Sequence, residues 1–361
     1  MKRKKILLIC PHPEDTAPGQ RLKYEQYLTY LRSEGYDIDI SPFMTLPFWN
    51  IVYKKGYFLQ KVFWTLMGYL RRVGDLFRLP FYDGIYIFLW VTPFGPPIFE
   101  RLFVFFNAKV IYDIDDMVFL RHSSSANRFM EVFKGRAKPI YLMKKAKHII
   151  VCTPLLNQFV QQYNPNTTDI SSTINTQTYL PINTYSNDLQ ALTIGWSGSH
   201  STSKYLYLLK DVFLELQKTH SFKLLVIGDP HFEMEGIDLE AIKWESATEV
   251  QNLQRIDIGV YPLPDEEWVY GKSGLKALQY MTLGIPTVAT AIGANFRVIE
   301  DGVSGFLVQK NEEWLKVLQQ LLDNPSLRKE IGVKARQRVQ DYYSIEANKH
   351  KYLDAFSKVF N

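Results

Sequence analysis

The sequence predicts an α/β protein made of two doubly wound domains that face each other across a cleft. The chain has 361 residues, about twice the length of an ordinary domain. Short apolar runs alternate with longer amphipathic stretches, which is typical of parallel sheets covered by helices on both faces. The alternation occurs twice, on either side of an almost uncharged stretch at 164–190 that is rich in Asn, Thr, Ser and Pro. We therefore expect one domain at 1–180 and a second at 190–343.

The first predicted strand, at 5–10, ends at Pro11 and is too short for the core of a signal peptide. Strand-like apolar runs predict further strands of the first domain at 36–40, 84–91, 109–114 and 148–153. Amphipathic spacing predicts helices at about 20–34, 57–78, 96–106, 137–146 and 154–163.

In the second domain the same patterns predict strands at 192–196, 223–227, 258–261 and 287–290, and helices at about 202–219, 273–283 and 311–341. The helix at 273–283 is followed by Gly284 and Pro286, which are common stop signals. Two successive units of this kind make two Rossmann-like domains. Ligands of such sheets bind at the carboxyl ends of the strands, so the cleft is the expected binding site.

Composition excludes several classes of protein. Apolar residues make up 46% of the chain and charged residues 22%, unlike disordered or collagen-like sequences. Cys10 and Cys152 are the only cysteines, which excludes a disulfide framework and a cysteine-rich zinc site and favours the cytosol. No apolar run reaches the roughly 18–20 residues of a membrane-spanning helix. Neither domain has the GxGxxG turn of nicotinamide-dependent oxidoreductases.

Cations and aromatic rings are concentrated near the start of the chain. The net charge is +5, and residues 1–110 hold 15 Lys and Arg against 9 Asp and Glu. Helical spacing places an apolar stripe within 53–78, formed by Phe58, Val62, Leu66, Tyr69, Val73 and Leu76. Six cations accompany this stripe: Lys54, Lys55, Lys61, Arg71, Arg72 and Arg78. The pattern fits a helix lying on an anionic membrane surface, and the alternative is an amphipathic helix packed on the sheet.

Two turns of the second domain have compositions that suit phosphate. The first lies between the strand at 192–196 and the following helix, and it contains Gly198, Ser199, Thr202 and Lys204. Backbone N–H groups, hydroxyls and a lysine at such a junction can bind a diphosphate. The alternative is that Ser199 or Ser201 only caps the helix. A second small-residue turn, at 291–295, includes Gly293 and Asn295, and we expect it to serve the same ligand.

Two segments carry a family resemblance. The run LQYMTLGIPTVAT is similar to the "EAMA-GIPVVAT" segment, and IGANFRVIEDGVSGFLV to the "GGxxExVxDGxxGxLV" segment, of the family 4 glycosyltransferases. The chain thus resembles retaining GT-B enzymes that use nucleotide-sugar donors, specifically over about 190–345 and more weakly before that. The resemblance implies a donor site in the second domain, an acceptor site in the first, and a last stretch at 344–361 that crosses back to the first domain.

The chain departs from the family at two glutamates eight positions apart, which contact the donor sugar and the ribose. Gly271 and Gln279 occupy these positions. Gln279 can still hydrogen-bond ribose hydroxyls, whereas Gly271 has no side chain. Either Glu266 or Glu267 replaces the first glutamate, or the donor is held differently. The pattern GKxxxKxLQYM is similar to a subgroup associated with surface-polysaccharide synthesis.

An enzyme of this fold must stabilise the departing nucleoside diphosphate. Lys272, just before the helix at 273–283, is the expected catalytic cation, and the alternative is a solvated surface lysine. Lys276 lies one turn later, and we expect it to flank the site without binding the ligand.

In the first domain, Gly19 and Arg21 lie in a turn similar to the family's glycine-containing loop between donor and acceptor. Gly19 permits close backbone approach, and Arg21 can bind an anion. The strand at 109–114 contains Asp113 and is followed by Asp115 and Asp116. Relatives often have His-Asp at this location, and the resemblance implies that Asp115 and Asp116 take that position. We expect Asp115 to orient the acceptor hydroxyl. The alternatives are an acidic cluster that caps the loop and a metal site, although the resemblance implies that no metal is required.

These features together predict a glycosyltransferase, of the hexosyltransferase type, that acts with retention in cell-surface polysaccharide synthesis. The expected partners are a nucleotide-sugar, a lipid-linked saccharide acceptor and an anionic membrane surface at 53–78, with no nucleic acid and no cofactor. The expected location is cytoplasmic, peripheral on the inner face of the plasma membrane. The alternatives are a GT-B nucleotide-sugar epimerase and a non-catalytic partner that binds a nucleotide-sugar.

Overall fold

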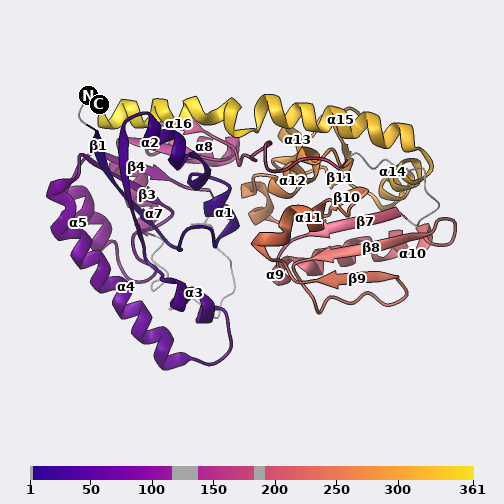
Figure 1. The fold of residues 1–361 in the computed structure, drawn as a ribbon, viewed down its shortest axis with the longest axis horizontal. Coiled ribbons are helices and arrows are strands. Elements are labelled where there is room, and N and C mark those ends of the chain that lie inside the picture. Colours follow the sequence, from indigo (N-terminus) through magenta and orange to yellow (C-terminus); the bar gives the residue numbers. More distant parts are fainter. Residues whose placement is uncertain (1–2, 116–136, 183–191) are drawn as a thin grey trace. The chain divides into compact units, whose positions relative to one another are not determined.

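A computed structural model of the chain describes residues 3–115, 137–182 and 192–361. The described chain forms two compact units (Figure 1). The first unit comprises Met1–Ser171 together with Asn348–Asn361, and the second comprises Ser172–Ala347.

The first unit is built on a parallel sheet of six strands in the order β2-β1-β3-β4-β5-β6. Its strands are β1 (Lys4–Cys10), β2 (Tyr36–Pro42), β3 (Gly84–Phe88), β4 (Val110–Asp113), β5 (His148–Val151) and β6 (Thr167–Asp169). The helices are α1 (Pro18–Arg21), α2 (Leu28–Ser33), α3 (Leu46–Val52), α4 (Phe58–Arg78), α5 (Ile98–Phe106), α7 (Ala137–Lys145), α8 (Pro154–Gln161) and most of α16 (Ile345–Phe360). Strands β3, β4 and β5 are buried along their whole length, because helices cover both faces of the sheet.

Helix α16 completes the core of the first unit. The ring of Tyr352 stacks on Tyr27 with 4.3 Å between the centroids, and Phe356 lies 5.6 Å from Tyr86. A Cβ on Gly84 would lie 2.2 Å from the ring of Phe360, so the glycine is required for the close approach of this helix to β3.

The second unit is built on a parallel sheet in the order β12-β11-β10-β7-β8-β9. The strands are β7 (Leu192–Ser197), β8 (Phe222–Ile227), β9 (Leu239–Ile242), β10 (Ile258–Tyr261), β11 (Thr287–Thr290) and β12 (Phe306–Val308). The α-helices are α9 (His200–Ser203), α10 (Lys210–Leu216), α11 (Glu249–Leu253), α12 (Leu275–Thr282), α13 (Asn295–Val298), α14 (Asn311–Asp323) and α15 (Pro325–Tyr342). The core between the sheet and α10 and α14 contains Trp196, Phe213, Trp314 and Leu318.

All the strands predicted from the apolar runs are present. The sequence did not predict β6, β9 and β12, which are edge strands of only three or four residues. The described part of the stretch at 164–190 contains β6 and the buried apolar side chains Ile170, Ile174 and Tyr179, although its composition predicts a connecting segment. Within the described residues, no helix has both the length and the apolarity needed to cross a membrane.

Candidate functional site

The strand order of the second unit defines where a ligand is expected. From β7 the chain proceeds outward through β8 and β9, and it then returns to β10 on the other side of β7 and proceeds through β11 and β12. The direction of winding therefore reverses between β7 and β10. Open α/β sheets bind their ligands at the carboxyl ends of the two strands that flank such a reversal.

Glycines bring two backbone loops together at this edge. Gly198 follows β7, and its N–H donates to Ile227 O of β8 at 2.9 Å. Gly228 follows β8 with a φ of +114°, and a Cβ there would lie 1.8 Å from Gly198 O. Any side chain at Gly228 would therefore force the two loops apart.

The loop after β7 is a single helical turn. The helix predicted at 202–219 is divided into α9, a 3₁₀ segment at Lys204–Leu209, and α10. Ser199 is the N-cap residue of α9, and its N–H donates to Thr202 Oγ1 at 3.2 Å. Ser199 thus caps this turn, as the alternative interpretation held, while its side chain stays at the surface.

Two predicted lysines lie on a pair of aromatic rings. The rings of Tyr205 and Trp268 are 5.4 Å apart, with 31° between their planes. Lys204 Nζ lies 5.1 Å from the Tyr205 centroid, and Lys272 Nζ lies 5.6 Å from the Trp268 centroid. The structure therefore brings Lys204 and Lys272 together from the loops that follow β7 and β10.

Lys276 occupies a more central position than the sequence predicted. Its Nζ lies 4.4 Å from the Trp196 ring centroid and 5.5 Å from that of Tyr261, at the ends of β7 and β10. The same Nζ is 3.4 Å from Thr202 Oγ1. Burial, assisted by the nearby charge of Lys272, lowers the pKa of Lys276 to about 7.

Gln279 is buried in α12 and bound to a carboxylate that the sequence analysis missed. Its Nε2 donates to Glu249 Oε1 at 3.0 Å. Glu249 also accepts from Trp244 Nε1 at 3.0 Å and from Tyr179 OH at 2.7 Å. Glu249 lies 30 residues before Gln279 and belongs to no motif. The only signal for such a residue is the general rule that a buried glutamine needs a hydrogen-bond partner.

The turn at 291–295 packs against the segment before α12. Gly293 has a φ of +53°, and a Cβ there would lie 3.3 Å from Tyr270 Cα. A Cβ on Gly274, the N-cap of α12, would lie 3.4 Å from Asn295 Oδ1. Asn295 Nδ2 donates to Thr290 O at 2.9 Å, so this side chain shapes its own turn.

Near the missing family glutamate, Gly271 is buried, and the neighbouring acidic residues have protein partners. Glu266 accepts a hydrogen bond from Trp268 Nε1, and Tyr270 OH donates to Asp265 Oδ1 at 2.9 Å. Glu267 begins the 3₁₀ segment Glu267–Gly271.

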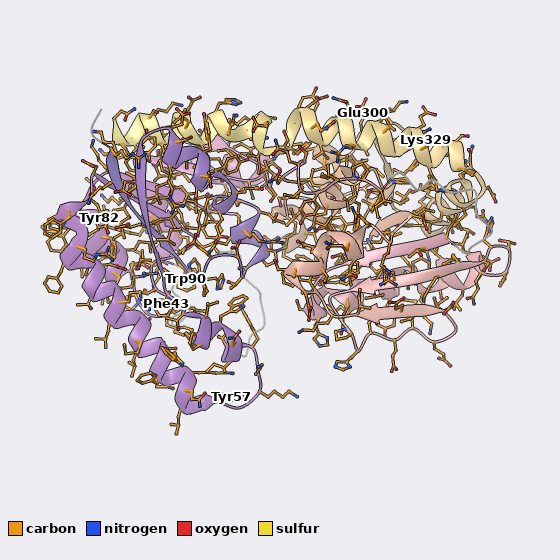
Figure 2. The ribbon with its side chains drawn as sticks, viewed as in Figure 1. Phe43, Tyr57, Tyr82, Trp90, Glu300 and Lys329 are labelled. Carbon is orange, nitrogen blue, oxygen red and sulfur yellow. The ribbon has the colours of Figure 1, made fainter. Side chains whose placement is uncertain are left out.

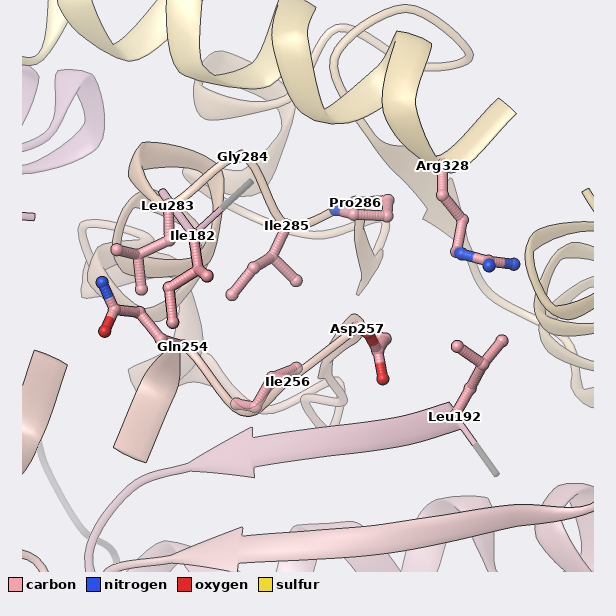
Figure 3. A pocket seen from close by; sticks show the side chains of 10 residues that line it. All are labelled: Ile182, Leu192, Gln254, Ile256, Asp257, Leu283, Gly284, Ile285, Pro286 and Arg328. Carbon is pink, nitrogen blue, oxygen red and sulfur yellow. The ribbon is translucent and has the colours of Figure 1, made fainter. Parts of the chain in front are cut away.

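A pocket of about 400 Å³ lies at the carboxyl ends of β10, β11 and β12, within the size range of small-molecule sites. Among its lining residues are Pro262, Leu263, Thr290, Ile292 and Gln309. A second pocket, of about 40 Å³, lies at the opposite edge of the sheet, where Leu192, Asp257 and Pro286 mark the amino ends of β7, β10 and β11 (Figure 3). This second pocket is therefore away from the carboxyl ends of the strands, where sheets of this kind bind their ligands.

In the first unit, α1 and the end of β4 bring Gly19 and Asp115 together. A Cβ on Gly19 would lie 3.0 Å from Asp115 Oδ2. Arg21 is the last residue of α1 and is half-buried. His12, which the sequence did not single out, follows β1, and its Nδ1 is buried with no hydrogen-bond partner among the described residues. Burial lowers the pKa of His12 to about 4. The sequence signal that could have drawn attention to this residue is its place in Pro-His-Pro, directly after a predicted strand.

Asp113 has a structural role. It is fully buried at the end of β4, and its Oδ1 lies 2.6 Å from Lys23 Nζ, which is buried with it. Tyr86 OH also donates to this carboxylate. Asp113 is therefore removed from the acceptor-binding cluster that the sequence predicted, and Asp116 lies outside the described residues.

Helix α4 points an apolar stripe at solvent. Figure 2 shows its side chains projecting outward between Tyr57 and Tyr82. The exposed apolar residues of the helix are Phe58, Leu59, Val62, Phe63, Leu66, Met67, Leu70, Val73 and Phe77, and Leu59 and Phe77 are 80% and 78% exposed. The buried residues are instead Gly68, Arg72 and Asp75. The helix therefore presents its apolar side outward and a polar stripe inward.

The inclusion of Arg72 among the membrane-facing cations was wrong. Its guanidinium is fully buried, lies 2.9 Å from Asp75 Oδ2, and donates to Val91 O at 2.8 Å and to Cys10 O at 3.0 Å. Periodicity did not separate Arg72 from the exposed cations, because a buried ion pair looks like surface charge in a sequence. Lys54 and Lys55 are exposed, and Arg78 is half exposed.

Comparisons with known proteins identify relatives of this chain. Residues 191–324 match the family described as glycosyl transferases group 1. A stretch of 86 residues is 34% identical to trehalose synthase of Pyrococcus horikoshii and covers 24% of this chain and 21% of that protein. The match thus spans about a fifth of the length of that relative.

Solved structures share the fold over almost the whole chain. Sucrose-phosphate synthase from Thermosynechococcus elongatus aligns with a TM-score of 0.72 and 17% identity over 99% of both chains. HepE of Anabaena, in complex with UDP and glucose, aligns with a TM-score of 0.67 and 14% identity over 98% of this chain and 100% of its own. The fold is the α/β GT-B fold, and the second unit carries the segment matched by the group 1 glycosyltransferases.

Proposed function

We propose that this protein is a retaining glycosyltransferase whose second unit binds a nucleotide-sugar. The observation that carries the proposal is the edge at β7 and β10, where small-residue loops and three lysines meet inside the segment matched by group 1 glycosyltransferases. HepE has been solved with UDP and with UDP-glucose, which supports a donor of this class.

The donor's groups are assigned to particular side chains. Lys204 and Lys272 bind the diphosphate together with the loop Gly198, Ser199 and Thr202. The turn with Gly293 and Asn295 supports the same ligand, and Gln279 offers its free amide oxygen to the ribose. Fixed cations of this kind stabilise charge on a leaving diphosphate, so the proposal includes no resident metal.

The transfer step follows from retention. The acceptor hydroxyl oxygen forms a bond to the anomeric carbon on the face from which the diphosphate leaves, while the bond between that carbon and the diphosphate oxygen breaks. The acceptor proton passes to the departing diphosphate oxygen. Asp115 orients the acceptor, and Gly19 and Arg21 line its loop.

The acceptor is proposed to be a lipid-linked saccharide of cell-surface polysaccharide synthesis, used at the inner face of the plasma membrane. Support comes from α4, whose outward apolar stripe is accompanied by the exposed Lys54 and Lys55. Such helices bind in the headgroup region of anionic bilayers.

A screen of nucleotide-sugars by thermal shift tests the donor assignment, because a ligand at 100 times its Kd adds about 2.7 kcal/mol to stability. Product analysis then separates the alternatives. A glycoside supports the transferase, and a new nucleotide-sugar without glycoside indicates an epimerase. Donor binding with neither product indicates a non-catalytic partner.

A further inference from the structure

Lys276 places an ammonium at the centre of the β7–β10 edge. Of the charged residues in the described ranges, no carboxylate lies within ion-pair distance of its Nζ. The polar contact of the ammonium is Thr202 Oγ1 at 3.4 Å, and the faces of Trp196 and Tyr261 enclose it. Contacts with aromatic faces offset only part of the cost of removing an ammonium from water.

The position of the ammonium points to its ligand. A Cβ on Gly198 would lie 2.6 Å from Lys276 Nζ, so the lysine touches the loop that follows β7. Lys204 and Lys272 lie over the Tyr205–Trp268 ring pair instead. An anion bound against the Gly198 loop is therefore in reach of Lys276.

We propose that Lys276 contacts the diphosphate of the donor and neutralises it as it leaves, and is thus a catalytic residue in addition to Lys272. The assignment rests on the proposed function, because it takes the anion to be a nucleoside diphosphate. It differs from the sequence expectation, which gave Lys276 no ligand.

Proton uptake on binding follows from the electrostatics around Lys276. The groups that face Lys276 are Lys272 from the preceding loop, Tyr261 from β10, and the uncharged Trp196 and Thr202 from β7 and α9. Burial raises the pKa of Tyr261, so this phenol stays neutral. With a pKa of about 7, Lys276 is partly neutral near pH 7.5, and a bound diphosphate draws a proton onto it.

Calorimetric titration at pH 7.5 tests the assignment. UDP, GDP and ADP and their nucleosides are titrated into the wild type and into Lys276→Met, Lys276→Arg and the matched control Lys243→Met. Lys243 is exposed and lies 3.2 Å from Glu245. Buffers of different ionisation enthalpy report protons taken up on binding.

For the diphosphate that binds the wild type, we expect Lys276→Met to weaken binding about 10- to 100-fold, with the matching nucleoside unaffected. Lys276→Arg keeps the charge and is expected to bind without proton uptake, because arginine is always protonated. This arginine variant also serves as the test if the methionine variant fails to fold.

Two results overturn the assignment in distinguishable ways. If the wild type binds none of the three diphosphates, the proposed function fails and Lys276 loses its ligand. If the wild type binds one, but Lys276→Met binds it equally well or Lys276→Arg takes up the same protons, the assignment to Lys276 fails alone.

Discussion

Gln279 Nε2 and Glu249 Oε1 are 3.0 Å apart in the interior of the second unit. This hydrogen bond requires a glutamine and not a glutamate at position 279, because the Glu249 carboxylate needs a donor and the neutral amide supplies one. The same carboxylate is held by Tyr179 OH and Trp244 Nε1, so its position is fixed from three sides.

We expect Gln279→Glu, which restores the residue of the family motif, to destabilise the protein by about 1–3 kcal/mol or more. The substitution removes a hydrogen bond and places two buried carboxylates side by side. Urea denaturation measures the loss. The double variant Glu249→Gln with Gln279→Glu re-creates an amide–carboxylate pair and should recover most of the stability. Equal stability of Gln279→Glu and the wild type would contradict the pairing.

Gln279→Ala has two expected effects. The KM for the donor rises, because the amide oxygen no longer reaches the ribose, and the free energy of unfolding falls by about 1–3 kcal/mol, because buried Glu249 loses a donor. Steady-state kinetics and denaturation separate the two. A loss of stability with an unchanged KM would assign Gln279 to structure alone.

Lys204→Ala and Lys272→Ala are expected to weaken nucleoside diphosphate binding by about 1.5–3 kcal/mol and to leave nucleoside binding almost unchanged. The reason is that, in the proposed donor site, both lysine ammonium groups contact the phosphates and not the base. Titration of both ligands into each variant provides the comparison. Losses of the same size for both ligands would remove the two lysines from the phosphate site.

Lys276→Met should stabilise the protein without ligand in a pH-dependent way. The pKa of Lys276 is lowered from 10.5 to about 7, so the folded state resists protonation and stability falls as the pH drops from 10.5 towards 7. Below pH 7 the penalty is constant. We expect the melting temperature of the variant to exceed that of the wild type at pH 6.5, by about 2–4 °C for each kcal/mol gained. This difference in melting temperature should become smaller at pH 9.5. If the difference in melting temperature between the variant and the wild type did not change with pH, Lys276 would not be desolvated in the folded protein.

Membrane binding is tested on α4. Replacing Leu59, Leu66 and Phe77 by Ser should abolish flotation with anionic vesicles, because each leucine or phenylalanine adds about 1.5–3 kcal/mol when buried. The melting temperature should hardly change, because all three are exposed. Replacing Lys54 and Lys55 by Gln should weaken binding by about 1 kcal/mol each.

Arg72→Met is the matched contrast within the same helix. It leaves Asp75 buried without its main partner, so we expect a loss of about 3–5 kcal/mol in stability. Vesicle binding of the folded fraction should persist. If the serine variant floats like the wild type, the stripe of α4 has another partner.

Apolar pattern predicted the fold well, for a physical reason. A strand that is covered by helices on both faces must be largely apolar, and the apolar runs of β1, β3 and β10 therefore predicted these strands. Edge strands such as β9 are half-buried and leave no such run. The sequence pattern did not decide which face of α4 is buried, because helical spacing defines two faces of a helix but not which of them packs against the sheet.

The candidate site was predictable where a motif carries it and not where contacts cross the sequence. Gln279 was found from its motif, whereas its partner Glu249 belongs to none. Lys276 was expected to flank the site because it lies one turn after Lys272. Only the contacts with Trp196 and Tyr261 show where its ammonium lies.

The return of α16 to the first unit has a consequence for folding during synthesis. The second unit is one continuous segment, Ser172–Ala347, and its sheet can be assembled once that segment has left the ribosome. The first unit lacks Tyr352, Phe356 and Phe360 until the segment Asn348–Asn361 has left the ribosome. At about 5–20 residues per second, the nascent first sheet therefore waits roughly ten seconds or more with part of its core open, a period in which chaperones are best placed to act.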